Sequence, residues 1–178
     1  MSDQILGLGK LGGQIVDRIM NVRPDACVHA VDTDVDRLMK LRNVLPGNRW
    51  VALGSKKNGN SKYCNLELNK PSVHGLKYFT ADLVTLVAGA DNGALFATEC
   101  IMRDEHSCRW GKDRKYIIAI PAETKLPKNN IAKQIENFLK HNSKITIIKV
   151  KDVRAPLEDS VYQEVAQNVI KLHYGLMG

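Results

Sequence analysis

The sequence predicts an α/β protein built on a parallel sheet with helices on both faces. Short apolar runs rich in β-branched residues alternate along the chain with segments of helical period. Strands that alternate with helices favour right-handed crossovers between parallel strands, which place helices on both sides of the sheet. The 178 residues, 44% apolar and 25% charged, fit one domain that is large enough to bury a core.

The expected strands are short and lie far enough apart to leave room for helices. They cover residues 3–6, 27–31, 50–53, 83–88, 116–120 and 145–150. Residues 55–81 break this rhythm because they contain lysines, asparagines, two glycines and Pro71 with little periodicity. We expect a long loop there, and loops of that length in compact domains are often functional.

Apolar residues at helical spacing follow the first and second strands and precede the sixth. The positions that carry these patterns are Ile15 and Ile19; Val35, Leu38 and Met39; and Ile131, Ile135, Phe138 and Leu139. The first of these helices is expected over residues 14–20. A final helix is expected from about residue 156 to residue 174, with one apolar stripe formed by Leu157, Val161, Val165, Val169 and Leu172.

The composition also narrows the class of protein. The chain has no run of eighteen apolar residues, and its first residues lack the features of a signal peptide, so we expect a cytoplasmic protein that does not insert into membranes. Its four cysteines are irregularly spaced without a CxxC pair, which is typical of reduced thiols. No metal site is predicted.

The net charge of +7 is concentrated in one third of the chain. Residues 103–151 hold twelve Lys or Arg and five Asp or Glu, which accounts for the whole excess. Such a region can attract phosphate, nucleic acid or an acidic partner. Because the charges are scattered and only Trp110 and Tyr116 could stack on bases, a solvated basic face is favoured over a nucleic-acid site, which remains open.

A glycine-rich motif lies between the first strand and the first helix. Residues 7–13 read GLGKLGG and satisfy GxGxxG, which lets backbone amides approach an oxyanion at the positive end of a helix. Asp32 follows the second strand, twenty residues after Gly12, where a carboxylate can accept hydrogen bonds from a ribose. The motif therefore predicts nucleotide or dinucleotide binding. Alternatively, the glycines serve close helix–strand packing, and Asp32 helps cap the next helix together with Asp34 and Asp36.

The segment GLGKLGGQIVDR at residues 7–18 resembles the first loop and helix of the tubulin/FtsZ superfamily, particularly its archaeal CetZ branch. Four further segments are similar to that family in the same order: AVDTD at 30–34, DLVTLVAG at 82–89, LKHNSKITII at 139–148 and VYQEV at 161–165. The resemblance implies a Rossmann-like, three-layer, doubly wound sheet of about six strands in the order 3-2-1-4-5-6. It also implies a single GTPase-type domain over residues 1–178 that ends at the central helix, without the C-terminal activation domain.

The resemblance also implies where a nucleotide would bind. The first loop and the second strand contribute Gly7, Gly9, Lys10, Gly12, Gly13, Gln14 and Asp32. The family's glycine- and threonine-rich signature loop corresponds to GADNGALF at residues 89–96, with Gly89, Asp91, Asn92 and Gly93 as candidates. This loop departs from the family pattern, because Asp91 would face the phosphates with a like charge. Asp91 could instead bridge a cation or, with Asn92, cap the next helix.

Recognition of the base and sugar departs from the family as well. Lys151 and Ala166 stand where the family reads guanine with amide or acidic side chains, which removes two hydrogen-bond partners of the base. Tyr162 keeps the aromatic position that stacks on the base, although a tyrosine on an apolar stripe also fits a core position. Glu123 is the one counterpart of the family's sugar-contacting residues.

We therefore expect a minimal, degenerate FtsZ/CetZ-like domain in which GTP or GDP binding is weak or lost. It would have no catalytic residues and no self-sufficient GTPase activity, and would act as a regulatory or cytoskeleton-related interaction module. The apolar stripe of its last helix would be uncovered, so we expect a symmetric dimer or binding to a longer FtsZ- or tubulin-like protein. The alternative is a Rossmann-type protein that binds NAD or an adenine nucleotide through the glycine loop and Asp32.

Overall fold

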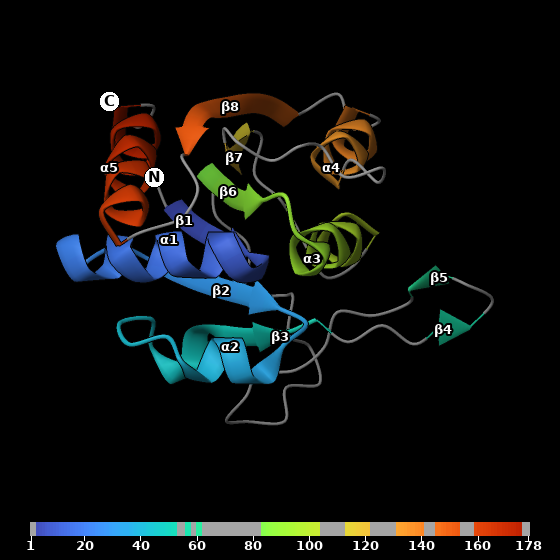
Figure 1. Cartoon of the computed structure of the whole chain (residues 1–178), viewed down its shortest axis with the longest axis horizontal. Coiled ribbons are helices and arrows are strands. Elements are labelled where there is room, and N and C mark those ends of the chain that lie inside the picture. The colour runs from blue at the N-terminus through green and yellow to red at the C-terminus, as the bar shows by residue number, and fades with distance from the viewer. Residues whose placement is uncertain are drawn as a thin grey trace.

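The computed structural model describes residues 3–52, 56–57, 60–61, 83–103, 113–121, 131–140, 145–153 and 159–175. Within these residues, six parallel strands form one sheet in the order β3-β2-β1-β6-β7-β8 (Figure 1). The strands are β1 (Asp3–Leu8), β2 (Val28–Asp32), β3 (Arg49–Val51), β6 (Leu83–Gly89), β7 (Asp113–Pro121) and β8 (Ile145–Val153). The expected α/β class and strand order are confirmed.

The helices of the described residues cover both faces of this sheet. They are α1 (Gly9–Val22), α2 (Val35–Met39), the 3-10 turn η1 (Pro46–Asn48), α3 (Asn92–Arg103), α4 (Ile131–Lys140) and α5 (Asp159–Gly175). Figure 1 shows α1 beside α5 and α3 beside α4, and these helix pairs are in contact. A separate antiparallel pair, β4 (Lys56–Lys57) with β5 (Asn60–Ser61), lies in the segment that we expected to be a loop.

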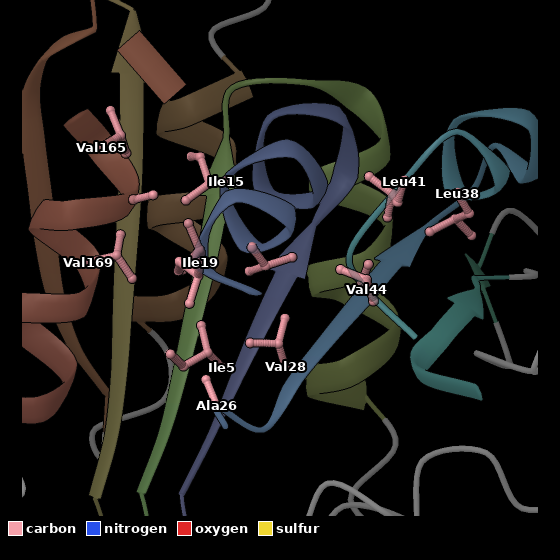
Figure 2. Packing of buried hydrophobic residues seen from close by; sticks show 14 of the residues in the cluster. Ile5, Ile15, Ile19, Ala26, Val28, Leu38, Leu41, Val44, Val165 and Val169 are labelled. Carbon is pink, nitrogen blue, oxygen red and sulfur yellow. The ribbon is translucent and has the colours of Figure 1, made fainter. Parts of the chain in front are cut away.

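Two apolar clusters lie on opposite faces of the sheet. One contains Leu6 of β1 together with Ile135 of α4, and the other joins Ile5 of β1 to Ile15 of α1 (Figure 2). Ile5 and Leu6 are neighbours in the chain yet enter different clusters, because successive side chains of a strand point to opposite faces. β1 is therefore covered on both sides, as expected for a central strand of a parallel sheet.

The expectation that the last helix exposes its apolar stripe is wrong for the residues described. Val165 and Val169 of α5 are 3% and 0% exposed, and they belong to the same cluster as Ile15 and Ile19 of α1 (Figure 2). The stripe faces α1 within the same domain because α5 runs beside α1 over the sheet. Leu157 and the side chain of Val161 lie outside the described residues. The stripe therefore gives no support to dimerisation through this face.

A buried bridge links the start of β1 to the end of α5. Nε2 of His173 lies 2.6 Å from a carboxylate oxygen of Asp3, and Nδ1 lies 2.6 Å from the Thr85 hydroxyl. A carboxylate only accepts, so Nε2 carries the proton and Nδ1 accepts from Thr85. Burial lowers the pKa of His173, against the opposing effect of Asp3, which agrees with a neutral ring.

His29 of β2 is a second buried histidine and makes stability sensitive to acid. The Trp50 indole donates to Nδ1 of His29 at 3.1 Å, and burial lowers the pKa of His29 to about 4. Because the unfolded-state pKa is about 6.5, only the unfolded chain takes up this proton between pH 6.5 and 4. Stability should therefore fall as the pH drops through that window, by up to about 3 kcal/mol.

The measurement is urea unfolding from pH 7 to pH 4, for the wild type and for His29→Gln. Glutamine keeps an acceptor for the Trp50 indole but does not titrate. The difference in unfolding free energy between the two proteins should shrink as the pH falls from 6.5 to 4. A difference that is independent of pH would contradict the buried neutral state of His29.

Candidate functional site

The glycine loop forms the junction between β1 and α1. β1 ends at Leu8 and α1 begins at Gly9, so the loop residues supply the first helical turn, five residues earlier than the sequence pattern indicates. Gly9 has a φ of 75°, which is favourable for glycine alone, and a Cβ there would collide with the Asp91 carboxylate and the Ala94 amide. This position requires glycine for both reasons.

A carboxylate accepts hydrogen bonds from the backbone amides at the start of α1. Asp91, directly before α3, accepts hydrogen bonds from the backbone amides of Lys10 at 3.3 Å and Leu11 at 3.4 Å. The same carboxylate accepts from the amide of Ala94 at 2.9 Å, which makes it the N-terminal cap of α3. The interpretation of Asp91 as a helix cap is therefore correct, and the carboxylate also serves a second helix. Burial raises the pKa of Asp91, while these three amides oppose the shift.

Asp32, at the end of β2, is held by an arginine from α2. Nε and Nη2 of Arg37 donate to the two carboxylate oxygens at 2.8 and 2.7 Å, and the Thr33 amide donates at 2.7 Å. Asp32 is only 2% exposed. The cap of α2 is Asp34, which accepts from the amides of Asp36 and Arg37. The interpretation in which this segment caps the next helix is thus correct for Asp34, whereas Asp32 anchors Arg37.

A cavity of about 270 Å³ lies beside the glycine loop and is surrounded by three cationic side chains. Its lining consists of Gly9, Lys10, Gly13, Gln14, Asp32, Arg37, Leu38, Lys40 and Leu41. A second cavity of about 240 Å³ shares Gln14 and Lys40 with the first and continues along α1 to Arg18. Among the described residues, Lys10 and Lys40 form no ion pair.

The remaining glycines set the packing around this cavity. Gly7 and Gly12 face each other between β1 and α1, and a Cβ on Gly7 would collide with the Gly12 carbonyl. Gly89 lies against the side chain of Leu11. A Cβ on Gly93 would meet Asp32 at 2.6 Å, Arg37 at 2.9 Å and Asp91 at 3.2 Å, so the first turn of α3 touches both carboxylate sites. Asn92 is exposed at the start of α3.

Of the residues expected to contact the base, Tyr162 and Ala166 have side chains that the structure describes, and neither lines the cavity. Tyr162 of α5 is partly buried against the cluster shared with α1, and it is absent from the lining of the cavities beside the loop. Lys151 belongs to β8, three strands from β1 in the sheet. Ala166 is fully buried. Glu123 lies outside the described residues, as do residues 104–112, 122–130 and 141–144 of the basic region.

Comparison with known proteins identifies the fold. A scan against protein-family models found no match, and a search of the curated proteins found none. Solved structures do match. CetZ1 from Haloferax volcanii, solved as a GDP-bound monomer, gives a TM-score of 0.59 at 16% identity over 96% of this chain and 58% of that protein. The chain has the tubulin/FtsZ fold.

Further solved structures with the tubulin/FtsZ fold match this chain at similar TM-scores. TubZ from Clostridium botulinum phage c-st, truncated in its C-terminal tail, gives a TM-score of 0.58 at 15% identity over 97% of this chain and 61% of its own. CetZ2 from Haloferax volcanii, solved as a GTPγS-bound protofilament, gives a TM-score of 0.56 at 14% identity over 97% of this chain and 58% of that protein. The chain thus spans about three fifths of the length of these tubulin/FtsZ-fold proteins.

The sequence analysis did not single out three side chains that add charge to the cavity or hold the backbone near it in this tubulin/FtsZ fold. Arg37 and Lys40 contribute charge to the cavity, and Asp17 of α1 accepts from the backbone amides of residues 42–44. Arg37 lies on the expected second helix, five residues after Asp32, and this spacing could have indicated the ion pair between them. Asp17 and Arg18 lie within the segment that resembles the family, but their spacing gives no indication of what Asp17 contacts.

The described residues of this tubulin/FtsZ fold also bear on metal binding and membrane insertion. Within them, no group of three or more His, Cys, Asp or Glu side chains is placed to hold a metal ion. No helix among them is long and apolar enough to cross a bilayer.

Proposed function

We propose that this chain is a degenerate nucleotide-binding domain of the tubulin/FtsZ type, which binds GDP or GTP weakly and does not hydrolyse GTP on its own. One observation carries the proposal: the Asp91 carboxylate accepts from the Lys10 and Leu11 amides at the N-terminus of α1. Backbone amides at the start of a helix after a glycine loop are a phosphate site. A nucleotide at this site has to compete with an acceptor that the chain itself provides.

The charge and size of the cavity support phosphate as the part of the ligand that is recognised. Lys10, Arg37 and Lys40 surround a space of about 270 Å³, which is below the usual range of about 300 to 1,000 Å³ for small-molecule sites. With Ala166 buried and Tyr162 packed in a core cluster, the described residues offer few contacts to a base. We infer that affinity depends on phosphate and sugar, so that GMP and GDP bind about as well as GTP.

The dinucleotide alternative is less well supported. It requires Asp32 to accept from a ribose hydroxyl, and Arg37 already engages both oxygens of that carboxylate. We further propose that the domain works through association, with itself or with a longer protein of the same fold. CetZ2 was solved as a protofilament, which supports association without defining the contact.

The test is calorimetry with GMP, GDP, GTP, ATP, NAD and NADP, together with phosphate release from GTP and light scattering of the same samples. We expect dissociation constants weaker than about 100 μM, similar for the guanine nucleotides, and no turnover. Lys10→Gln should weaken binding because it removes a cation from the cavity. Lys171→Gln is the matched control, because Lys171 is exposed on α5 away from the cavity lining.

Strict selectivity for GTP, or steady GTP turnover by the purified chain, would overturn this proposal. Submillimolar NAD binding that depends on Asp32 would favour the dinucleotide alternative instead.

A further inference from the structure

One carboxylate serves the N-termini of two helices that belong to different faces of the sheet. Asp91 accepts from Lys10 and Leu11 at the start of α1, and from Ala94 in the first turn of α3. α1 belongs to the cluster on one face, while Ala94 of α3 belongs to the other. The positive ends of both helix dipoles therefore meet at this side chain. A helix cap alone would need only the contact to Ala94.

The contact to α1 places a negative oxygen where the glycine loop offers its amides. Carboxylate and phosphate oxygens use the same donors, and two such anions in one site repel each other. Burial raises the pKa of Asp91, so the carboxylate is held in a place where its charge is disfavoured by desolvation. Asp91 thus uses the backbone donors that a phosphate at the glycine loop would also use.

We propose that Asp91 is a built-in competitor of phosphate, which has to leave the Lys10 and Leu11 amides before a nucleotide can bind. This inference rests on the proposed function, because it concerns the same site. Asp91 remains the cap of α3, so its departure from α1 moves or rotates the first turn of α3. Occupancy of the glycine loop is thereby coupled to the position of α3.

The coupling extends to α2 through the contacts around Gly93. The position of a Cβ on Gly93 lies 2.6 Å from Asp32 and 2.9 Å from Arg37, so the first turn of α3 packs directly on this ion pair. The negative charge of Asp91 also acts on Arg37, whose pKa it helps to raise. A phosphate that replaces Asp91 at the amides gives Arg37 a new anionic partner. Binding of the ligand therefore shifts the positions of α2 and α3 together, through the contacts between the first turn of α3 and the Asp32–Arg37 ion pair.

The test compares Asp91→Ser with the wild type, using inorganic pyrophosphate and GDP as probes in calorimetry and thermal-shift measurements. Serine still caps α3 but is too short to reach the Lys10 and Leu11 amides. Both probes should bind Asp91→Ser about tenfold or more tightly than the wild type, since the competing anion is gone. Asp91→Asn keeps the size of the side chain and removes its charge, so it should give a smaller gain.

The matched control is Asp25→Ser, which removes an exposed carboxylate that pairs with Arg23 after the C-terminal end of α1, at the opposite end of that helix from the glycine loop. It should leave the affinity for pyrophosphate within about twofold of the wild type. Circular dichroism of each variant establishes that it is folded.

The outcomes separate this inference from the proposed function. If Asp91→Ser binds neither probe more tightly while the wild type binds GDP, the inference is wrong and the proposed function stands. If pyrophosphate binding tightens but GDP binds to neither protein, Asp91 is the competitor and the proposed function is wrong. If neither protein binds either probe, both are wrong.

Discussion

Asp17→Ala is expected to destabilise the fold by about 3 to 4 kcal/mol, because it leaves buried amides without an acceptor. Asp17 is 2% exposed, and its Oδ1 accepts from the amides of Asn43 at 2.7 Å and Val44 at 3.0 Å. Its Oδ2 lies 3.3 Å from the Arg42 amide. Within the described residues, no other side chain of α1 accepts from these amides, so Asp17→Ala removes the hydrogen bonds between α1 and the segment after α2 and leaves only the apolar packing.

Urea unfolding of three proteins checks this prediction. Asp17→Asn is isosteric and can still accept through one oxygen, so it should lose roughly half as much stability as Asp17→Ala. Asp36→Ala removes an exposed carboxylate from α2 and should change stability by less than about 0.5 kcal/mol. A loss below about 1 kcal/mol for Asp17→Ala would mean that water replaces the carboxylate at these amides.

Gly12→Ala is expected to cost about 3 kcal/mol or more of stability, because a Cβ at this position overlaps the carbonyl oxygen of Val87. Val87 lies in β6 and its neighbour Gly7 in β1, so the obstacle is backbone that cannot rotate away. α1 would have to lift from the sheet, which would open the cluster under it and displace the glycine loop.

The neighbouring glycine provides the control. At Gly13 a Cβ would meet only the Leu41 side chain, at 4.0 Å, so Gly13→Ala fits without movement. Alanine is also the better helix former by about 0.5 to 1 kcal/mol, so this variant should be as stable as the wild type or more so. Thermal unfolding of the two variants side by side should separate their midpoints by about 7 °C or more. Equal midpoints would contradict the close approach of α1 to β6.

The architecture could be predicted because it follows from patterns local to the chain. Runs of mostly apolar residues indicate strands that are buried on both faces, and residues 5–8 of β1 and Leu83–Gly89 of β6 have this pattern. The error about the last helix has a physical reason. An apolar stripe through Val165 and Val169 predicts burial but does not identify the partner, and Ile15 and Ile19 of α1 already provide one.

The site could be predicted only in part, because its decisive contacts join residues far apart in the chain. The strand-to-helix context of the glycine loop is visible in the sequence, and so is the ability of Asp91 to cap a helix. The contact between Asp91 and Lys10 spans 81 positions, and it depends on β6 lying next to β1. The role of each residue toward a nucleotide stays a prediction.

The bridge from His173 to Asp3 and Thr85 has a consequence for how the chain is made. Residues 3 and 173 are 170 positions apart, so β1 leaves the ribosome well before α5 and meets this partner only after α5 has been made. Until then, the face of the sheet that α5 covers is exposed on a half-made chain, where unpaired apolar surface promotes aggregation. This face of the sheet is consequently covered only once α5 has been made, and a synthesis product interrupted before α5 would lack the contact between His173 and Asp3.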